Sequence, residues 1–382
     1  MSEIAVSAVM PCLNEERTLG ACIEKAQGAF RALGIVGEVV VADNGSTDRS
    51  VEIAAALGAR VVHEARKGYG AALTAGIAAA RGRIVVMADA DDSYDWAALG
   101  DFVRQVDAGY DLVMGNRFKG GIEPGAMPPL HRYFGNPVLS TLARWMYRIP
   151  IGDFHCGMRA FRRDAFERIQ PRTSGMEFAT EMVVNAAHAG LRIAEIPTRL
   201  YPDKRDRPPH LRSFRDGWRH LRFMLTYAPD VLYLAPGMIM SVLGVAGMML
   251  LATGPATIGG GFRLGIHFLA LASLLALLGT NVTAFGLVAR LVNAKRNPIR
   301  PESLFGRLLQ QFTLERGIVL GGAMFFCGLI VDAWIFSEWV SRRFGDMSDT
   351  VHSAFVASTF MVLGINVVFA AFLFNMIRDE GK

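Results

Sequence analysis

Four long apolar stretches in the C-terminal part of the chain constrain its fold more than any other feature of the sequence. Each contains at least 19 residues, and they cover 233–252, 264–289, 318–336 and 353–377. A helix rises about 1.5 Å per residue, so each stretch can cross a hydrocarbon core of about 30 Å. Residues 1–232 carry charged side chains throughout, as in an ordinary globular protein. The sequence therefore predicts a globular domain followed by an all-α membrane domain of four helices.

The basic residues between the spans predict their orientation. Six of them lie in the loop 290–316, whereas the loops around Arg263 and around Arg342 contain three together. Cytoplasmic loops are enriched in Lys and Arg, so we expect 290–316 to be cytoplasmic. Four spans then place the C-terminus on the same side as the N-terminal domain. The first apolar run is short, follows Glu3 and has no basic leader, which also favours an N-terminus inside the cell.

Short apolar runs alternate with helical patterns in the globular part. We expect strands at 4–10, 38–42, 59–62, 84–88, 111–114 and 193–196. Helical patterns cover 14–33, 49–57, 71–80, 139–147 and 178–189. This alternation is typical of an α/β domain with a mostly parallel, Rossmann-like sheet, in which ligands bind at the carboxyl ends of the strands. The chain thus divides into an α/β domain, a juxtamembrane segment and a membrane domain, at 1–201, 202–232 and 233–382.

Polar side chains coincide with four of the expected strand ends: Asn14, Asp43, Asp89 and Asp91. One such residue alone is often no more than a helix cap, but four indicate a shared ligand site. Asp89-Ala90-Asp91 is the sharpest pattern, because two carboxylates at the end of a strand can turn toward one divalent cation. Hard carboxylate oxygens suit Mg²⁺ or Mn²⁺, and few protein ligands leave coordination positions for substrate phosphates.

The juxtamembrane segment is basic and amphipathic. From Asp203 to Arg222 it has seven basic residues against three acidic ones. A basic segment beside a membrane span is typical of a surface that binds anionic membrane lipids. No nucleic-acid recognition module accompanies it, so we expect no nucleic-acid partner. Residues 213–227 place Trp218 and other apolar side chains at helical spacing among arginines, which predicts an interfacial helix; a helix that packs on the globular domain is the alternative.

The strand-end motifs occur in a recognisable order: Pro11-Cys12-Leu13-Asn14-Glu15, Asp43-Asn44-Gly45-Ser46-Thr47-Asp48, Lys67-Gly68-Tyr69-Gly70 and Asp89-Ala90-Asp91. In this order and spacing they resemble the motifs of inverting family 2 glycosyltransferases with the GT-A fold. Later segments resemble the dolichol- and polyprenyl-phosphate sugar synthases of that family: Gly115-Asn116-Arg117, His131-Arg132, 153–161 and 177–181. The resemblance covers residues 4 to about 200.

The resemblance implies where a nucleotide-sugar donor would bind. The donor-binding residues would be Pro11, Glu15, Asp43, Lys67, Asp89 and Ala90. The Asp43 carboxylate would accept a hydrogen bond from the base, and Lys67 would line the donor pocket. The ligands of Mg²⁺ or Mn²⁺ on the donor diphosphate would be Asp89, Asp91 and Ser93, the last at a position where relatives often carry Gln.

The resemblance also implies the acceptor site and the reaction. Arg117 and Arg132 would bind the acceptor phosphate, and together with Asp91 they form the expected catalytic set. The reaction would be the inverting transfer of a hexose to undecaprenyl or dolichyl phosphate at the cytoplasmic membrane face. UDP-glucose is the first choice of donor and GDP-mannose the second. Relatives of this type further imply a homo-oligomer formed through the helices.

Some residues depart from the family pattern or leave alternatives open. Leu13 stands where many relatives have Tyr, and 201–210 replaces a segment that serves the acceptor lid. Glu177 and Glu181 are four residues apart on one helical face. Either one of them faces the site, or one carboxylate is solvated and the other acts as a cap or pairs with an arginine. For His155 we expect a hydrogen-bonded structural histidine.

Structural roles are expected for the polar residues within the spans. Asp332 is interpreted as an interface residue within about one turn of a span end. Asn281, Asn366 and Asn375 are expected to form hydrogen bonds between helices.

Two other functions compete with the transferase. A processive polysaccharide synthase shares the catalytic domain, but its Q-x-x-R-W motif is missing after the helix at 178–189. A catalytically silent membrane scaffold is disfavoured by the intact Asp89 and Asp91.

Overall fold

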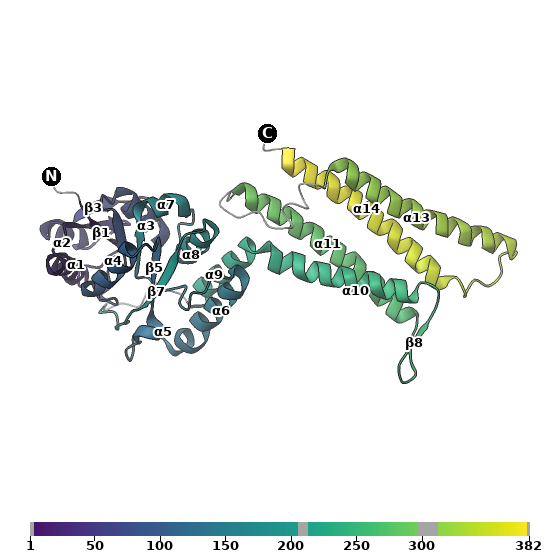
Figure 1. The fold of residues 1–382 in the computed structure, drawn as a ribbon, viewed down its shortest axis with the longest axis horizontal. Coiled ribbons are helices and arrows are strands. Elements are labelled where there is room, and N and C mark those ends of the chain that lie inside the picture. The colour runs from purple at the N-terminus through teal and green to yellow at the C-terminus, as the bar shows by residue number, and fades with distance from the viewer. Residues whose placement is uncertain (1–3, 205–212, 297–311, 380–382) are drawn as a thin grey trace. The chain divides into compact units, whose positions relative to one another are not determined.

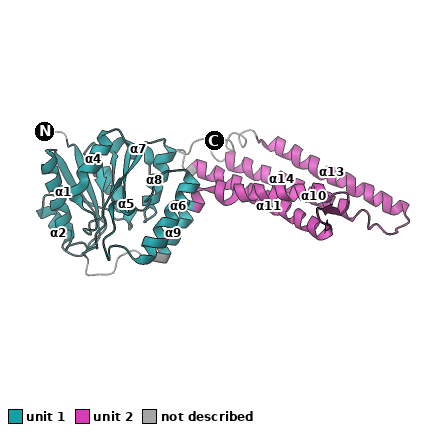
Figure 2. Ribbon diagram, turned by 60° about the horizontal axis from the view of Figure 1, so that its bottom comes forward, with its two compact units in different colours: residues 1–224, 299–301 teal, residues 225–298, 302–382 magenta. Residues whose placement is uncertain are grey.

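The computed structural model of the 382-residue chain describes residues 4–204, 213–296 and 312–379. It contains two compact units, the first ending at Met224 and the second beginning at Leu225 (Figure 2). The division falls within helix α9 (Ser213–Tyr227), whose bounds match those of the predicted amphipathic helix. The domain borders at 201 and 232 stay a prediction.

The first unit is built on a seven-stranded sheet with the order β3-β2-β1-β4-β6-β5-β7. The strands are β1 (Val6–Cys12), β2 (Gly37–Asp43), β3 (Arg60–His63), β4 (Ile84–Met87), β5 (Leu112–Asn116), β6 (Arg159–Arg162) and β7 (Ile193–Pro197). All neighbours are parallel except the pairs that involve β6. The predicted mostly parallel sheet is confirmed. The antiparallel β6 was not predicted, because four residues are too few to show a periodic pattern.

Strand β1 continues past Pro11, although the sequence pattern placed its end before this proline. β4 pairs only with Val6–Val9, so the last residues of β1 pair with β2 alone. Proline has no backbone N–H and is tolerated where one side of a strand is unpaired. The strand therefore reaches Cys12, and the following turn lies where the parallel strands have their carboxyl ends.

Helices cover both faces of the sheet (Figure 1). They are α1 (Leu19–Leu33), α2 (Ser50–Ala56), α3 (Tyr69–Ala79), α4 (Leu99–Asp107), α5 (Arg117–Gly120), α6 (Asn136–Tyr147), α7 (Arg163–Ile169) and α8 (Phe178–His188). The main core lies on the face where α1 and α4 pack against the sheet. On the other face, a Cβ on Gly76 of α3 would lie 2.7 Å from Cγ1 of Val9. Only a glycine lets α3 approach so closely.

The second unit contains four helices that are long and apolar enough to cross a membrane. They run over Asp230–Leu251, Ile266–Lys295, Leu314–Ser341 and Val351–Arg378. The corresponding elements are η3 (Asp230–Leu234) with α10 (Ala235–Leu251), α11 (Ile266–Arg296), α13 (Leu314–Ser341) and α14 (Val351–Asp379). The predicted number of spans is confirmed by length and composition. Which side of a membrane they face stays a prediction.

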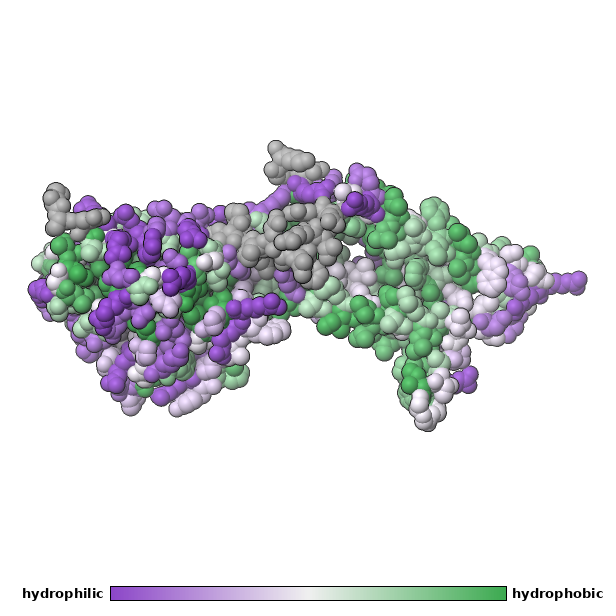
Figure 3. All heavy atoms as spheres, in the orientation of Figure 1, coloured by the Kyte–Doolittle hydropathy of each residue, from purple (hydrophilic) through white to green (hydrophobic). Residues whose placement is uncertain are grey.

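Details of the second unit differ from the sequence prediction. A short hairpin of β8 (Ala256–Ile258) and β9 (Phe262–Leu264) connects α10 to α11. Helix α13 continues to Ser341, so Asp332 lies well inside the helix rather than within one turn of its end. Apolar side chains cover much of the visible surface of the helices (Figure 3).

Candidate active site

The turns after β1 and β2 are hydrogen-bonded to each other. The Asn14 backbone N–H donates to the Ser46 hydroxyl at 2.9 Å, and the Thr47 N–H donates to the Asn14 carboxamide oxygen at 2.6 Å. Asn14 has a φ of 58°, in the left-handed region that asparagine adopts more readily than most residues. Because of this turn, α1 begins at Leu19 and not at Asn14.

Asn44 joins the turn after β2 to the turn after β3. Its carboxamide nitrogen donates to the carbonyl oxygens of Glu64 and Arg66 at 2.9 and 2.8 Å, and its oxygen accepts from the Gly68 N–H at 2.8 Å. The Lys67 ammonium donates to the Asn44 carbonyl oxygen at 2.8 Å. Gly68 has a φ of 138°, a conformation that only glycine adopts without strain.

Tyr69 and Thr18 connect these turns to the loop after β4. The Tyr69 hydroxyl is hydrogen-bonded to Asp89, and burial together with the negative charge of Asp89 raises the pKa of Tyr69 well above its ordinary value. The Thr18 hydroxyl donates to the Ala90 carbonyl oxygen at 2.7 Å. Thr18 is bonded to the first motif in turn, because its backbone N–H donates to the Glu15 carbonyl oxygen at 3.1 Å. Through Asn14, Asn44, Tyr69 and Thr18, the four strand-end motifs thus form a closed hydrogen-bonded ring, which we call the strand-end ring.

Asp91 is oriented by its own loop. Ser93 donates to its Oδ1 twice, from the backbone N–H at 3.0 Å and from the hydroxyl at 2.6 Å. Within the described residues, no three His, Cys, Asp or Glu side chains form a metal-binding group. Two carboxylates and a serine oxygen are nevertheless hard ligands of the kind that Mg²⁺ and Mn²⁺ prefer. This donor set fits a cation that takes its other ligands from phosphate and water.

Asp43 ends β2 and is 4% exposed. Its two oxygens accept from the N–H groups of Gly45 and Ser46 at 3.2 and 2.9 Å, and His63 Nδ1 lies 3.1 Å from Oδ2. Burial raises the pKa of a carboxyl, but the hydrogen bonds from Ser46, His63 and Gly45 together outweigh burial and lower the pKa of Asp43. The carboxylate is therefore ionised at neutral pH. Glu15 is also buried, next to the turn that follows β1.

Arg117 and Asp153 form a buried ion pair for which the sequence held no signal. Arg117 Nε donates to Asp153 Oδ2 at 2.7 Å, and Nη2 donates to Oδ1 at 2.8 Å. Burial favours the neutral carboxyl, yet the charge of Arg117 holds the pKa of Asp153 below its ordinary value. A guanidinium has five N–H donors, so this two-point contact orients Arg117 without using all of them.

Arg132 lies on the short helix η2 (His131–Gly135), with its guanidinium 5.5 Å from the Tyr133 ring centroid. Burial and the positive charge of Arg117 together lower the pKa of the neighbouring His131. His131 therefore lies within electrostatic range of Arg117. Tyr133 and Phe134 are 74% and 63% exposed, so η2 also presents aromatic side chains at the surface.

The two glutamates of α8 have different surroundings. Glu181 is buried, and its Oε2 accepts from the N–H groups of Arg172 and Thr173 at 3.0 and 2.8 Å. Glu181 therefore caps the loop before α8. Oε2 of Glu177 is buried without a hydrogen-bond partner in the part of the chain that the structure describes. Of the two glutamates, Glu177 thus has a buried carboxylate oxygen that can accept a further hydrogen bond. That one of them faces the site stays a prediction.

His155 is not hydrogen-bonded as the sequence suggested. Both ring nitrogens are buried and have no hydrogen-bond partner among the described residues. The ring instead packs edge-on against His220 of α9, with 4.7 Å between the ring centroids. Burial lowers the pKa of His155 well below its ordinary value, so the ring is neutral and acts as a packing group.

The segment after β7 returns to the loop that carries Asp91. The Tyr201 N–H donates to the Ser93 carbonyl oxygen at 2.9 Å. Asp92 is buried with a φ of 61° and forms ion pairs with Lys204 at 2.6 Å and with Lys25 at 2.5 Å. Two lysines that lie far apart in the sequence thus cover Asp92. The rest of the altered segment, 205–210, lies outside the described residues.

Helix α9 shows the packing that was one of the two alternatives from its sequence. His220 and Met224 are buried within the first unit. Trp218 is 58% exposed, and Arg222 is exposed as well. One face of the helix therefore packs on the α/β unit, while another exposes an aromatic and a basic side chain. The interfacial role of this second face stays a prediction.

Comparisons with known proteins cover both units. The model of glycosyl transferase family 2 matches residues 7–170, and that of the glycosyltransferase family 2 C-terminal transmembrane region matches 287–378. The solved structure of glucosyl-3-phosphoglycerate synthase from Mycobacterium tuberculosis aligns with 59% of this chain and 80% of its own, at 23% identity and a TM-score of 0.48.

Two relatives come from Haloferax volcanii. Dolichyl-phosphate hexose transferase is 35% identical over 50% of this chain and 81% of its own length. The low-salt glycan biosynthesis hexosyltransferase Agl6 is 39% identical over 99% of this chain and 91% of its own. The family matches and the full-length similarity to Agl6 show that the chain belongs to glycosyl transferase family 2, with a GT-A domain ahead of the C-terminal transmembrane region of that family.

Proposed function

We propose that the protein transfers a hexose, with inversion, from a nucleotide-sugar to a polyprenyl phosphate at the cytoplasmic face of a membrane. The observation that carries this proposal is the strand-end ring, which holds four motifs around Asp89 and Asp91. A hexosyltransferase and a dolichyl-phosphate hexose transferase among the relatives support the sugar class and the lipid acceptor.

On the donor side, the nucleoside would lie against Pro11, Glu15 and Asp43. The ionised Asp43 carboxylate would accept from the base, because its backbone contacts fix its direction. Lys67 would face the diphosphate. Its ammonium has three N–H donors and uses one on the Asn44 carbonyl oxygen, which leaves donors for a phosphate oxygen.

Asp89, Asp91 and Ser93 would hold Mg²⁺ or Mn²⁺ on the diphosphate, and the cation would neutralise the charge of the leaving group. The Ser93 hydroxyl donates its proton to Asp91, so its oxygen keeps lone pairs for a cation. Ala90 would contribute through its backbone, which is held by the hydrogen bond from the Thr18 hydroxyl to the Ala90 carbonyl oxygen. The buried oxygen of Glu177 would accept a hydrogen bond from a sugar hydroxyl.

The acceptor supplies its own nucleophile. A phosphate monoester is largely ionised near neutral pH, since its second pKa is about 6. One phosphate oxygen would form a bond to the anomeric carbon while the bond from that carbon to the diphosphate breaks on the opposite face. The nucleoside diphosphate leaves, and no protein base has to remove a proton. The task of the protein is to position the two phosphate groups.

Arg117 and Arg132 would bind the acceptor phosphate. Asp153 orients Arg117, whose other N–H groups can bind phosphate oxygens in the forked geometry that suits arginine. The exposed Trp218 and Arg222 of α9 would contact the lipid surface where that phosphate lies. We keep UDP-glucose as the first choice of donor, GDP-mannose as the second, and a homo-oligomer through the helices as an expectation.

The test is a donor panel with the full-length protein in lipid nanodiscs. UDP-glucose and GDP-mannose are each combined with undecaprenyl or dolichyl phosphate and with Mg²⁺ or Mn²⁺. We expect release of nucleoside diphosphate and a lipid that carries a single sugar. Asp91→Ala should lower the rate at least about 100-fold. Asp101→Ala, on the exposed surface of α4, is the matched control and should not change it.

Other outcomes would favour the competing functions. Products with several sugars would indicate a processive synthase. No turnover with any donor, or full turnover in Asp91→Ala, would contradict the enzyme and favour a silent scaffold.

A further inference from the structure

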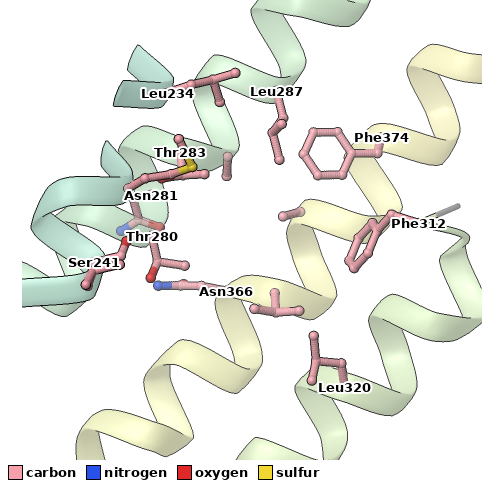
Figure 4. Close-up of a pocket in the computed structure, with 15 residues that line it drawn as sticks. Leu234, Ser241, Thr280, Asn281, Thr283, Leu287, Phe312, Leu320, Asn366 and Phe374 are labelled. Atoms are coloured by element: carbon pink, nitrogen blue, oxygen red, sulfur yellow. The ribbon is translucent and has the colours of Figure 1, made fainter. Parts of the chain in front are cut away.

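A cavity of about 460 Å³ lies in the second unit between α10, α11, α13 and α14 (Figure 4). Ten of its fifteen lining residues are apolar, and none of these described residues is ionisable. The size is typical of sites for small organic ligands. A ligand that enters this cavity must therefore be uncharged and mainly apolar.

The two sides of the cavity differ in polarity. On one side, Phe312 and Phe374 meet edge-on, with 6.2 Å between ring centroids. On the other side, Ser241, Asn281 and Asn366 gather near Thr280 (Figure 4). Asn281 and Asn366 lie near the middle of their spans, where a membrane offers no water to satisfy an amide.

The polar side chains around the cavity are not equivalent. The Thr280 and Thr283 hydroxyls donate to carbonyl oxygens of their own helix, those of Ala276 and Gly279, both at 2.8 Å. The carboxamides of Asn281 and Asn366, by contrast, form no hydrogen bond within the described residues. The hydrogen bonds between helices that we expected for these two asparagines are therefore not formed.

We infer that this cavity binds a neutral lipid alcohol, a molecule with a long apolar chain and one hydroxyl group. The phenylalanines and aliphatic side chains would pack against the chain. A carboxamide both donates and accepts hydrogen bonds, so Asn281 and Asn366 can satisfy both functions of a hydroxyl. A phosphate group would find no positive charge on these walls, so the site differs from the proposed acceptor site in the first unit.

The probe for this site is geranylgeraniol, compared with the hydrocarbon of the same carbon skeleton and with geranylgeranyl phosphate. Binding to the full-length protein in detergent is measured by native mass spectrometry, without any sugar donor. One hydrogen bond is worth about 1 kcal/mol, so the alcohol should bind about fivefold more tightly than the hydrocarbon. The phosphate should not displace it from this cavity.

Substitutions test whether the asparagines cause this preference. Asn281→Leu and Asn366→Leu should each remove most of the preference for the alcohol. Thr283→Val is the matched control: it also lines the cavity, but its hydroxyl is bonded to its own helix, so the preference should remain. Ala284→Leu should weaken binding of both probes, because it fills the cavity with apolar atoms.

Clear outcomes would overturn the inference. Equal binding of alcohol and hydrocarbon would show that the amides bind no hydroxyl. A preference that survives in both Asn→Leu variants, or unchanged binding in Ala284→Leu, would place the alcohol elsewhere. Circular dichroism and size-exclusion elution identify misfolded variants. If an asparagine variant fails to fold, binding to Ala284→Leu still tests whether the alcohol occupies this cavity. The measurement needs no turnover, so its result is independent of the transferase assay.

Discussion

The two units of the chain distribute apolar and polar side chains in opposite ways. In the first unit, Trp96 and Phe154 are fully buried, and polar side chains at the sheet edge bond to one another. In the second, Val319 and Phe369 are 71% and 67% exposed. Their helices approach closely at small residues, as at Gly321. The first unit therefore depends on apolar burial and satisfied polar groups, and the second on close backbone contact.

The largest expected effect concerns the buried ion pair of the first unit. Asp153→Ala leaves the Arg117 charge buried without its partner, which should destabilise the first unit by about 3–5 kcal/mol. Hydrogen exchange measured by mass spectrometry reports this loss unit by unit. We expect faster exchange around β5 and α5 and unchanged exchange in α13 and α14.

A double variant separates stability from function at the same pair. Arg117→Met with Asp153→Leu removes both charges, so it should recover much of the lost stability while transfer to the acceptor stays low. Equal losses of protection in both units after Asp153→Ala would contradict the distinction between them.

Close packing in the second unit predicts a smaller loss of stability, for which two neighbouring glycines serve as test and control. A Cβ on Gly321 would lie 2.5 Å from the Gly364 carbonyl oxygen, whereas Gly322 has no atom within 4 Å. Gly321→Ala should cost about 1–3 kcal/mol, and Gly322→Ala should be neutral or stabilise the helix by up to about 1 kcal/mol. Thermal unfolding in detergent measures both. If the two variants behave alike, backbone approach at Gly321 is not what holds α13 and α14 together.

The ion pairs of Asp92 predict a still smaller effect on stability. Lys204 is largely exposed, so Lys204→Met should cost less than about 1 kcal/mol. Because Lys204 fixes the segment that follows β7 beside the Asp91 loop, we expect the KM for the lipid acceptor to rise a few-fold and the KM for the donor to stay constant. Lys25→Met removes the other partner of Asp92, away from that segment, and should leave both KM values unchanged. A rise of the donor KM in Lys204→Met would argue against this role.

Moderate acidification should have the smallest effect. The folded-state pKa values of Asp43, Asp92 and Asp153 are lowered, so each carboxylate adds stability that is fully present above the ordinary pKa of about 4. This stability disappears as the pH falls through the lowered pKa values. The first unit should therefore keep its hydrogen-exchange protection from pH 7 to pH 5 and lose it before the second unit below about pH 4. Loss of protection between pH 7 and pH 5 would contradict this assignment.

Much of the architecture was predictable from the sequence because it depends on local patterns. The alternation of apolar runs and helices predicted a mostly parallel sheet, and the length of the apolar stretches predicted four spans. The bounds of α9 followed from helical spacing alone. The strand-end motifs could be found because residues at the carboxyl ends of neighbouring parallel strands meet at one edge of the sheet.

Only the tertiary structure decided which distant groups meet. Arg117 pairs with Asp153 and Asp92 with Lys204, although no spacing in the chain relates these residues. The unbonded carboxamides of Asn281 and Asn366 line a cavity to which four separate helices contribute. The physical reason is that the periodicity of apolar residues indicates only which local structure a segment forms and which side of it is buried. An ion pair, a hydrogen bond or a cavity depends instead on how side chains from segments far apart in the sequence are placed relative to one another.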